Sequence, residues 1–180
     1  MGIAKLSAMR SKDPRTQVGA CIVDGDDRIL SMGYNGMPRG CDDKDFPWDR
    51  EAEDILDTKY PYVVHAELNA ILNYRRGTLQ GSTLYVTLFP CNECAKAIIQ
   101  AGIKKVVYGK EYRSSEASKR MFDAAGVEYV KHAEEPIGLV SKAEAISGII
   151  KDHCMKCGPG CSNCGIEEAI EYLDDFGSVI

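Results

Sequence analysis

The sequence has no long hydrophobic run and no excess of positive charge, and each absence excludes a class of protein. None of its apolar stretches approaches the roughly 20 residues that a membrane span needs. The first ten residues, MGIAKLSAMR, lack the apolar core of a signal peptide. The chain carries 22 lysines and arginines against 27 acidic residues, whereas a general nucleic-acid binder needs a basic face to displace counterions from phosphates. We therefore expect a cytoplasmic protein without membrane contact, for which nucleic acid is an unfavoured partner.

Cysteine, by contrast, is plentiful, with eight residues among 180. In an intracellular chain, so many cysteines indicate metal ligands or buried thiols rather than a disulfide framework. The hydrophobic share of 44% and the charged share of 27% are typical of a soluble globular protein. The length suits one domain with at most a small appendage.

Apolar runs separated by turn residues predict an α/β fold. A short N-terminal helix is expected to carry Ile3, Leu6 and Met9 on one face. The Asp- and Pro-rich stretch 37–61 is expected to stay outside the core. The other expected elements are a hairpin of strands 18–23 and 29–32, helix 62–74, strand 82–89, helix 91–102, strand 104–109, helix 114–126 and strand 127–132. This order predicts helices on both faces of a mainly parallel sheet.

Two cysteines lie in the stretch FPCNECAKAII, at an expected junction between a strand and a helix. Pro90 suits the first turn of that helix, because its fixed φ is helical and its missing N–H is not needed there. Cys91 and Cys94 are three residues apart, so both sulfurs point the same way. The free N–H groups and the helix dipole favour thiolates at this place. The pair makes half of a zinc site.

The stretch VVHAELNAI supplies a third ligand, His65, and a carboxylate, Glu67. Residues two apart inside a helix point to nearly opposite sides, so both can face one centre only if the helix begins at His65. One histidine and two cysteines leave zinc a fourth position for water, as in catalytic sites. Glu67 could take a proton from the activated water and deliver it to a ring nitrogen and to departing ammonia. A CxxC pair alone would equally fit a structural metal knuckle or a redox motif, and HAE alone would indicate little. H-x-E together with P-C-x-x-C, however, is the established signature of zinc deaminases.

These motifs resemble the cytidine deaminase superfamily and, within it, the deoxycytidylate (dCMP) deaminases. The resemblance runs from about residue 6 to residue 132 and includes SKDPRTQVGACIV, GYNGMPRGC, DTKYPYVVHAELNAI and LYVTLFPCNECAKAII. It implies a deaminase domain over residues 1–132 with a three-layer α/β/α fold and a five-stranded mixed sheet. It implies hydrolysis of dCMP to dUMP, which feeds dTMP synthesis. It also implies a homo-oligomer, usually a hexamer, that dCTP with Mg²⁺ activates and dTTP inhibits.

The resemblance further assigns roles to single residues. His65, Cys91 and Cys94 match the zinc ligands, and Glu67 matches the proton shuttle. Asn35 matches a residue that contacts the sugar. The backbone around Ala66 and Pro90 would read the edge of the cytosine ring.

Contacts to the phosphate and to the effector are also expected, but each has a plain alternative. The candidates for the 5′-phosphate are Ser11, Lys12, Arg15 and Tyr112, because two cations and a hydroxyl can satisfy a dianion. Lys12 and Arg15 are equally explained as solvated surface charges. The effector pocket is expected to involve Met37, Pro38 and Arg39, although the glycines beside them equally fit a simple turn.

The composition changes after residue 132, and we interpret 133–180 as a small, Cys-rich, helical appendage. Its stretch HCMKCGPGCSNCG holds two CxxC pairs, and the Gly-Pro-Gly spacer allows a tight reversal between them. Four sulfurs would close a zinc sphere, which predicts a structural zinc bound by Cys154, Cys157, Cys161 and Cys164. An iron–sulfur cluster and free or redox-active thiols are the alternatives. His153 is an alternative ligand.

Two other functions compete with deamination of dCMP. A zinc deaminase acting on bases within RNA or single-stranded DNA would need a basic groove for the strand, and the acidic balance counts against it. A non-catalytic zinc protein that senses nucleotides would not need Glu67, whose presence counts against that function.

Overall fold

The computed structural model describes residues 1–113 and 115–133. Its five strands are β1 (Gly19–Val23), β2 (Ile29–Tyr34), β3 (Thr83–Leu88), β4 (Lys105–Lys110) and β5 (Glu128–Lys131). Its helices are α1 (Gly2–Ala8), α2 (Ala66–Asn73), α3 (Asn92–Gln100) and α4 (Glu116–Ala125), with a 3-10 turn, η1 (Ile55–Asp57). All the elements expected before residue 133 are therefore present. The largest difference is that α2 begins four residues after the start of the apolar pattern 62–74, close to the start at His65 that the HAE motif requires. The four cysteines of the appendage lie outside the described residues, and the boundary at residue 132 stays a prediction.

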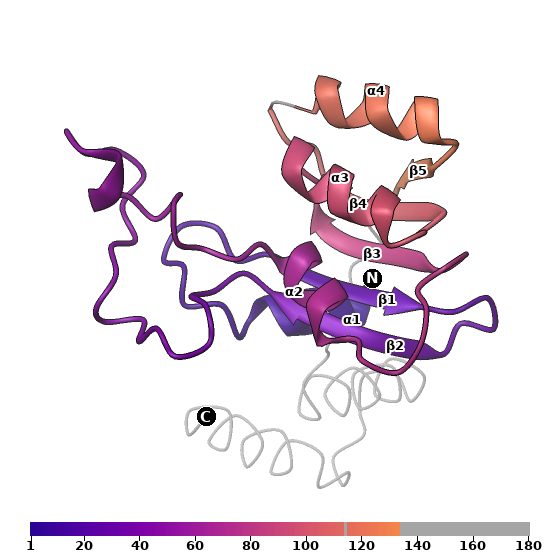
Figure 1. Cartoon of the computed structure of the whole chain (residues 1–180), viewed down its shortest axis with the longest axis horizontal. Coiled ribbons are helices and arrows are strands. Elements are labelled where there is room, and N and C mark those ends of the chain that lie inside the picture. Colours follow the sequence, from indigo (N-terminus) through magenta and orange to yellow (C-terminus); the bar gives the residue numbers. More distant parts are fainter. Residues whose placement is uncertain (114, 134–180) are drawn as a thin grey trace, which may run out of the picture. The chain divides into compact units, whose positions relative to one another are not determined.

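The sheet is mixed, with strand order β2-β1-β3-β4-β5 (Figure 1). β1 runs antiparallel to both of its neighbours, β2 and β3. β3, β4 and β5 are parallel to one another. The expectation of a mainly parallel sheet is therefore wrong for the β2–β1–β3 half, because the hairpin inserts β1 against β3 in the opposite direction. The mixed sheet implied by the resemblance is confirmed.

Helices cover both faces of the sheet, and alternate residues of β1 point to opposite sides. Ala20 and Ile22 lie in the larger core with Ala66 of α2, together with buried residues of α3 and α4. Cys21 packs on the other side with Ala4 of α1. The element order and the two layers of helices match the three-layer α/β/α expectation. In the part of the chain that the structure describes, no helix is long and apolar enough to span a bilayer.

The β3–α3 turn, which carries two of the candidate ligands, is held in place by aromatic packing. Phe89 is almost completely buried. Its ring meets Tyr108 edge-on with a centroid distance of 4.7 Å, and it also contacts Phe122 and Tyr129 at 6.1 and 5.8 Å. Such edge-to-face contacts stabilise a core beyond the area that they bury. The residue just before Pro90 is therefore rigidly anchored.

α1 buries a different face from the one its apolar residues suggest. Ile3, Leu6 and Met9 are all exposed, whereas Ala4 and Ala8 are buried. The cause is Gly19 of β1: a Cβ added there would lie 2.0 Å from the Ala4 carbonyl oxygen, so the backbones of helix and strand are in contact. A contact this close admits only small residues on the facing side of the helix.

Residues 37–63 form a long connection between β2 and α2, which we call the arm, and it extends away from the sheet (Figure 1). It has contacts of its own: Phe46 packs on Tyr62 with a centroid distance of 5.0 Å, and Trp48 Nε1 donates to the Asp43 carbonyl at 2.9 Å. Most of it is exposed, as expected from its composition. That expectation is wrong for Lys59, which is buried because its ammonium pairs with a buried carboxylate.

Candidate metal centre and nucleotide site

α2 begins where the chemistry of the HAE motif requires it to begin. His65 is the N-cap residue, in an extended conformation with φ −70° and ψ 154°. Glu67 lies in the first turn of the helix and is buried. Because the chain is extended at His65 and helical from Ala66, the two side chains are not forced to opposite sides. The prediction that the helix begins at His65 is confirmed.

α3 begins in the same way. Cys91 is the N-cap residue, with φ −71° and ψ 171°, and the buried Cys94 lies in the first turn. Pro90 is buried and precedes the N-cap, so the expectation that it forms part of the first helical turn is wrong: the helix begins two positions later, at Asn92. Its fixed φ instead suits the extended stretch that connects β3 to the helix.

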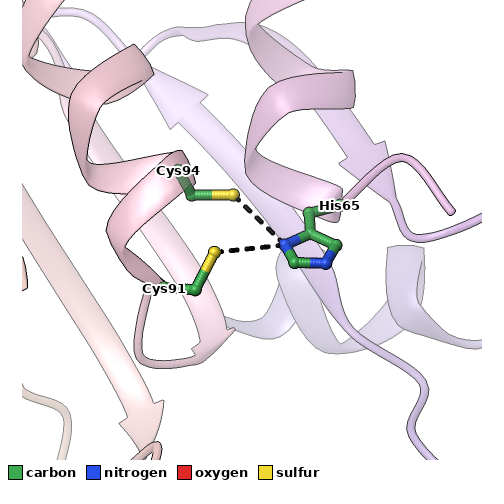
Figure 2. Close-up of side chains that lie close together, drawn as sticks. All are labelled: His65, Cys91 and Cys94. Carbon is green, nitrogen blue, oxygen red and sulfur yellow. Dashed lines mark hydrogen bonds between the residues drawn. The ribbon is translucent and has the colours of Figure 1, made fainter. Parts of the chain in front are cut away.

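The two helix starts bring three metal-binding side chains together (Figure 2). His65 Nδ1 lies 3.4 Å from Cys91 Sγ and 3.4 Å from Cys94 Sγ, and one donor atom of each residue lies within 4.8 Å of the others. One imidazole nitrogen and two sulfurs are ligands that zinc prefers, and three protein ligands leave a fourth position for water. The cluster therefore fits a zinc ion of the catalytic type.

The three side chains shift each other's pKa values strongly. The hydrogen bond from Cys94 lowers the pKa of Cys91 to about 3, and His65 adds to the effect. The same hydrogen bond, together with burial, raises the pKa of Cys94. The contact with Cys91 raises the pKa of His65. The site thus holds one thiolate readily, and a thiolate is the form of cysteine that binds metal.

Glu67 is the carboxylate of the cluster. Burial raises its pKa above the ordinary value of a glutamate. Its charge is among the causes that raise the pKa of Cys94, so the carboxylate lies beside the ligand sulfurs. A carboxyl group with a raised pKa is suited to accept and return a proton near neutral pH.

Contacts between α2 and β2 determine where His65 and Glu67 lie. A Cβ added at Gly33 would lie 2.3 Å from the Ala66 carbonyl oxygen, so the first turn of α2 rests directly on the strand. Ser31 Oγ donates to the Ala70 carbonyl at 2.7 Å. Asn69 Nδ2 donates to the Tyr34 carbonyl at 2.8 Å. The helix is therefore held against the strand by one close backbone contact and by two side-chain hydrogen bonds to backbone carbonyls.

The remaining predicted substrate and effector residues differ in burial and in their contacts. Asn35 is buried, and Gly36 after it forms a two-way backbone bridge with Val64, the residue before His65. Ser11 is also buried, and its Oγ accepts from the Asp13 N–H at 3.2 Å. Lys12, Arg15 and Tyr112 are exposed. Of the effector candidates, Met37 and Pro38 are half-buried and Arg39 is exposed.

The structure brings the three predicted metal-binding residues together, but it also shows a buried ion pair that was not identified from the sequence. Asp13 and Lys59 form an ion pair whose partners are 46 residues apart. An aspartate followed by proline is typical of a turn in which its side chain bonds the backbone, and this signal could have identified Asp13. Nothing in the sequence around Lys59 indicates its burial.

Comparison with known proteins gives consistent matches. The family model described as cytidine and deoxycytidylate deaminase zinc-binding region matches residues 1–110. Human deoxycytidylate deaminase is 56% identical over 135 residues, covering 73% of this chain and 76% of that protein. The probable deoxycytidylate deaminase of Drosophila melanogaster is 55% identical over 141 residues, covering 73% and 70%.

A solved structure also matches. It is that of the dCMP deaminase of the cyanophage S-TIM5 in complex with dCMP and dUMP. It is 35% identical, covers 73% of this chain and 92% of that chain, and has a TM-score of 0.60. The similarity in sequence, the mixed sheet and the His–Cys–Cys cluster all support one assignment. The chain belongs to the cytidine and deoxycytidylate deaminase family.

Proposed function

We propose that this chain is a zinc-dependent dCMP deaminase, which converts dCMP and water to dUMP and ammonia. The observation that carries the proposal is the cluster of His65, Cys91 and Cys94 with the buried Glu67 beside it. Its support is the 56% identity to human deoxycytidylate deaminase and the likeness to a phage enzyme solved with dCMP and dUMP.

In this proposal His65, Cys91 and Cys94 hold the zinc ion. When bound, zinc lowers the pKa of water from about 16 to about 7. Glu67 accepts the proton that the attacking water loses and passes it to ring nitrogen N3 of cytosine. The same carboxylate then moves a second proton from the added hydroxyl to the amino group, which leaves as ammonia. Burial of Glu67 suits this shuttle because it raises the carboxyl pKa.

Other groups position the nucleotide in the proposal. The backbone at Ala66 and Pro90, both buried beside the ligands, reads the cytosine edge, and Asn35 contacts the sugar. The exposed Lys12 and Arg15 attract the 5′-phosphate together with Tyr112. Ser11 is proposed to donate its O–H to the phosphate, since its Oγ accepts the Asp13 N–H and the hydroxyl hydrogen remains available.

The first experiment measures ammonia release from dCMP, deoxycytidine and CMP in parallel. We expect turnover of dCMP alone, and a loss of at least about 100-fold in Glu67→Gln with zinc still bound, because general acid–base catalysis contributes about 10²–10⁴-fold. Full activity in Glu67→Gln would contradict the role of the carboxylate. Activity on a cytosine-containing oligonucleotide but not on dCMP would replace the proposed substrate.

The proposal extends to regulation and assembly. We propose a cytoplasmic homo-oligomer, a hexamer, that supplies dUMP for dTMP synthesis, with dCTP and Mg²⁺ activating and dTTP inhibiting at a pocket that involves Met37, Pro38 and Arg39. Rates measured with each nucleotide, and the mass of the assembly in solution, test these points. Unchanged rates with both effectors would contradict the regulation.

A structural zinc at Cys154, Cys157, Cys161 and Cys164 completes the proposal. Metal analysis should then find two zinc ions per chain in the native protein, and one when all four of these cysteines are changed to serine. Iron in protein purified without air would contradict a second zinc.

A further inference from the structure

A buried ion pair joins two distant segments beside the proposed nucleotide site. The Asp13 side chain is 1% exposed and the Lys59 side chain 9%, and the Lys59 ammonium contacts Asp13 Oδ2. Asp13 belongs to the turn between α1 and β1, whereas Lys59 belongs to the arm and comes shortly before His65. Burying two charges is unfavourable unless both are well hydrogen-bonded. The presence of so deeply buried an ion pair is therefore not explained by stability alone.

The Asp13 carboxylate is fully hydrogen-bonded. Its Oδ1 accepts from the backbone N–H groups of Arg15 and Thr16, at 2.9 and 3.0 Å. Its Oδ2 accepts from Lys59 and from Asn35 Nδ2, the latter at 3.3 Å. Because Oδ2 is shared, the lysine and the asparagine are held relative to each other by one oxygen.

These contacts hold the Asn35 side chain in one orientation. Its Nδ2 donates to Asp13 and to the Thr16 carbonyl at 3.0 Å, so both amide hydrogens are used. Its Oδ1 has two lone pairs. Within residues 1–113 and 115–133, only the Val18 N–H donates to it, at 2.7 Å. Asn35 can therefore offer a ligand an acceptor but not a donor.

The backbone places this acceptor next to the metal ligands. Gly36 N–H donates to the Val64 carbonyl at 3.1 Å, and Val64 N–H donates back at 2.9 Å. His65 follows directly. The carbonyl of Lys59 accepts from the N–H groups of Tyr62 and Val63, which holds the turn leading into this bridge. The ion pair thus connects the two chain segments that meet at the site: Asp13 bonds Asn35, and Lys59 lies in the turn that leads to Val64 and His65.

We propose that Asp13 and Lys59 are positioning residues for the sugar of the nucleotide: their ion pair holds Asn35 Oδ1 as the acceptor for the 3′-hydroxyl. In a 2′-deoxyribose 5′-monophosphate the 5′ oxygen is esterified and the 2′ oxygen is absent, so the 3′-hydroxyl is the only donor on the sugar. The inference rests on the proposed function, because it takes dCMP and its product as the ligands of this site.

The test measures binding of two ligands by calorimetry to the zinc-loaded full-length chain. One is dUMP, and the other is its 3′-deoxy analogue, 2′,3′-dideoxyuridine 5′-monophosphate. Wild-type protein should bind dUMP about tenfold more tightly, the size of one good hydrogen bond. Lys59→Met removes the charge but keeps the chain length, and the ratio should fall below about threefold because Asn35 is no longer held.

Lys105→Met is the matched control. Lys105 forms an ion pair of 3.0 Å with Glu128 between β4 and β5, and both side chains are well exposed. Its loss removes the same charge without reaching Asn35, so the ratio should stay about tenfold. A ratio that falls equally in both variants would overturn the inference.

A second variant separates positioning from stability. Asp13→Asn/Lys59→Met removes both charges, and with them the unpaired buried carboxylate that destabilises Lys59→Met. Its melting temperature should recover toward that of wild type. The ratio should nevertheless stay below about threefold, because the introduced amide has only one acceptor oxygen and cannot accept from Asn35 and from the backbone N–H groups as the two oxygens of a carboxylate do. This variant also carries the test if Lys59→Met does not fold.

Three further results would overturn the inference: a tenfold ratio in Lys59→Met, a tenfold ratio in the double variant, or equal binding of the two ligands by wild type. In each case dCMP turnover by wild type would remain and the proposed function would stand. No ammonia release from dCMP by zinc-loaded wild type would instead overturn the proposed function itself.

Discussion

Two helices rest on the same hairpin, one from each face of the sheet, and both do so on a glycine. At Gly19 an added Cβ would lie 2.0 Å from the Ala4 carbonyl oxygen of α1, and at Gly33 it would lie 2.3 Å from the Ala66 carbonyl oxygen of α2. Of these two helices, only α2 starts from a proposed metal ligand, His65. The same kind of contact therefore contributes stability on one face, and both stability and site geometry on the other.

Removal of zinc should produce the largest difference in amide exchange between the helices on the two faces. Zinc at about a thousand times its dissociation constant stabilises a folded chain by about 4 kcal/mol, and a chelator would remove that amount. Because the ligands lie at the starts of α2 and α3, amide exchange should rise there by more than about tenfold, while α1 stays protected. Hydrogen exchange with and without chelator measures this. Equal loosening of α1 would show that the metal stabilises the whole domain evenly.

Adding one methyl group at each glycine compares the faces directly. Gly33→Ala should lower the free energy of unfolding by about 3 kcal/mol, since backbone atoms must move. It should also lower dCMP turnover on the order of 100-fold, because a shift of the α2 start displaces His65 and Glu67.

Gly19→Ala should cost a similar free energy but leave turnover of the folded protein within about threefold. Urea denaturation, zinc content and turnover measured below the melting point of both variants check this pair. Comparable activity losses in the two would mean that α1 also controls the site.

Two serines give a milder version of the same comparison. Ser7 Oγ of α1 donates to the Gly33 carbonyl at 2.8 Å, and Ser31 Oγ of β2 donates to the Ala70 carbonyl of α2 at 2.7 Å. Each change to alanine should cost about 1 kcal/mol of stability. Only Ser31→Ala should change the zinc affinity, which a competing chelator measures. A change in zinc affinity in Ser7→Ala would argue against the difference between the faces.

Acid should weaken the ion pair between Asp13 and Lys59, and we expect this to be the smallest of the effects on stability. Burial raises the pKa of Asp13, but the Lys59 ammonium and the N–H groups of Arg15 and Thr16 lower it more, so the net pKa lies below its ordinary 3.8. A lowered folded pKa stabilises the protein above the ordinary value, and this contribution is lost as pH falls through the folded pKa. The difference in unfolding free energy between wild type and Asp13→Asn/Lys59→Met should therefore shrink from about pH 5 to about pH 3. A constant difference would show that Asp13 does not titrate in this range.

Much of the metal centre could be predicted because its signals are local. The HAE and PCNEC motifs lie at helix starts, so the approximate directions of the ligand side chains follow from nearby residues. Alternating apolar runs likewise predicted the helices and strands. The direction of β1 relative to β3 was not predictable in this way, because it depends on which edge of the hairpin meets the rest of the sheet.

Contacts between distant segments were the part that the sequence could not predict. Lys59 looks like any surface lysine in a polar loop, and only the folded chain shows Asp13 within reach. Gly19 and Gly33 could each have marked a bulge or a turn, and their helix contacts depend on tertiary packing. The same packing explains why Ile3, Leu6 and Met9 are exposed: a helix that touches a strand at the backbone has space only for alanines on that side.

The residues that begin α2 and α3 do not perform the usual task of such residues. An N-cap is commonly Ser, Thr, Asp or Asn, whose side chain accepts a backbone N–H and stabilises the helix by about 1 kcal/mol. Neither His65 nor Cys91 makes such a bond. A directed-evolution experiment that selected only for heat resistance in metal-free medium would therefore be expected to enrich His65→Asp and Cys91→Ser. Such a selection would produce a more stable protein in which two of the proposed zinc ligands have been replaced by better helix caps.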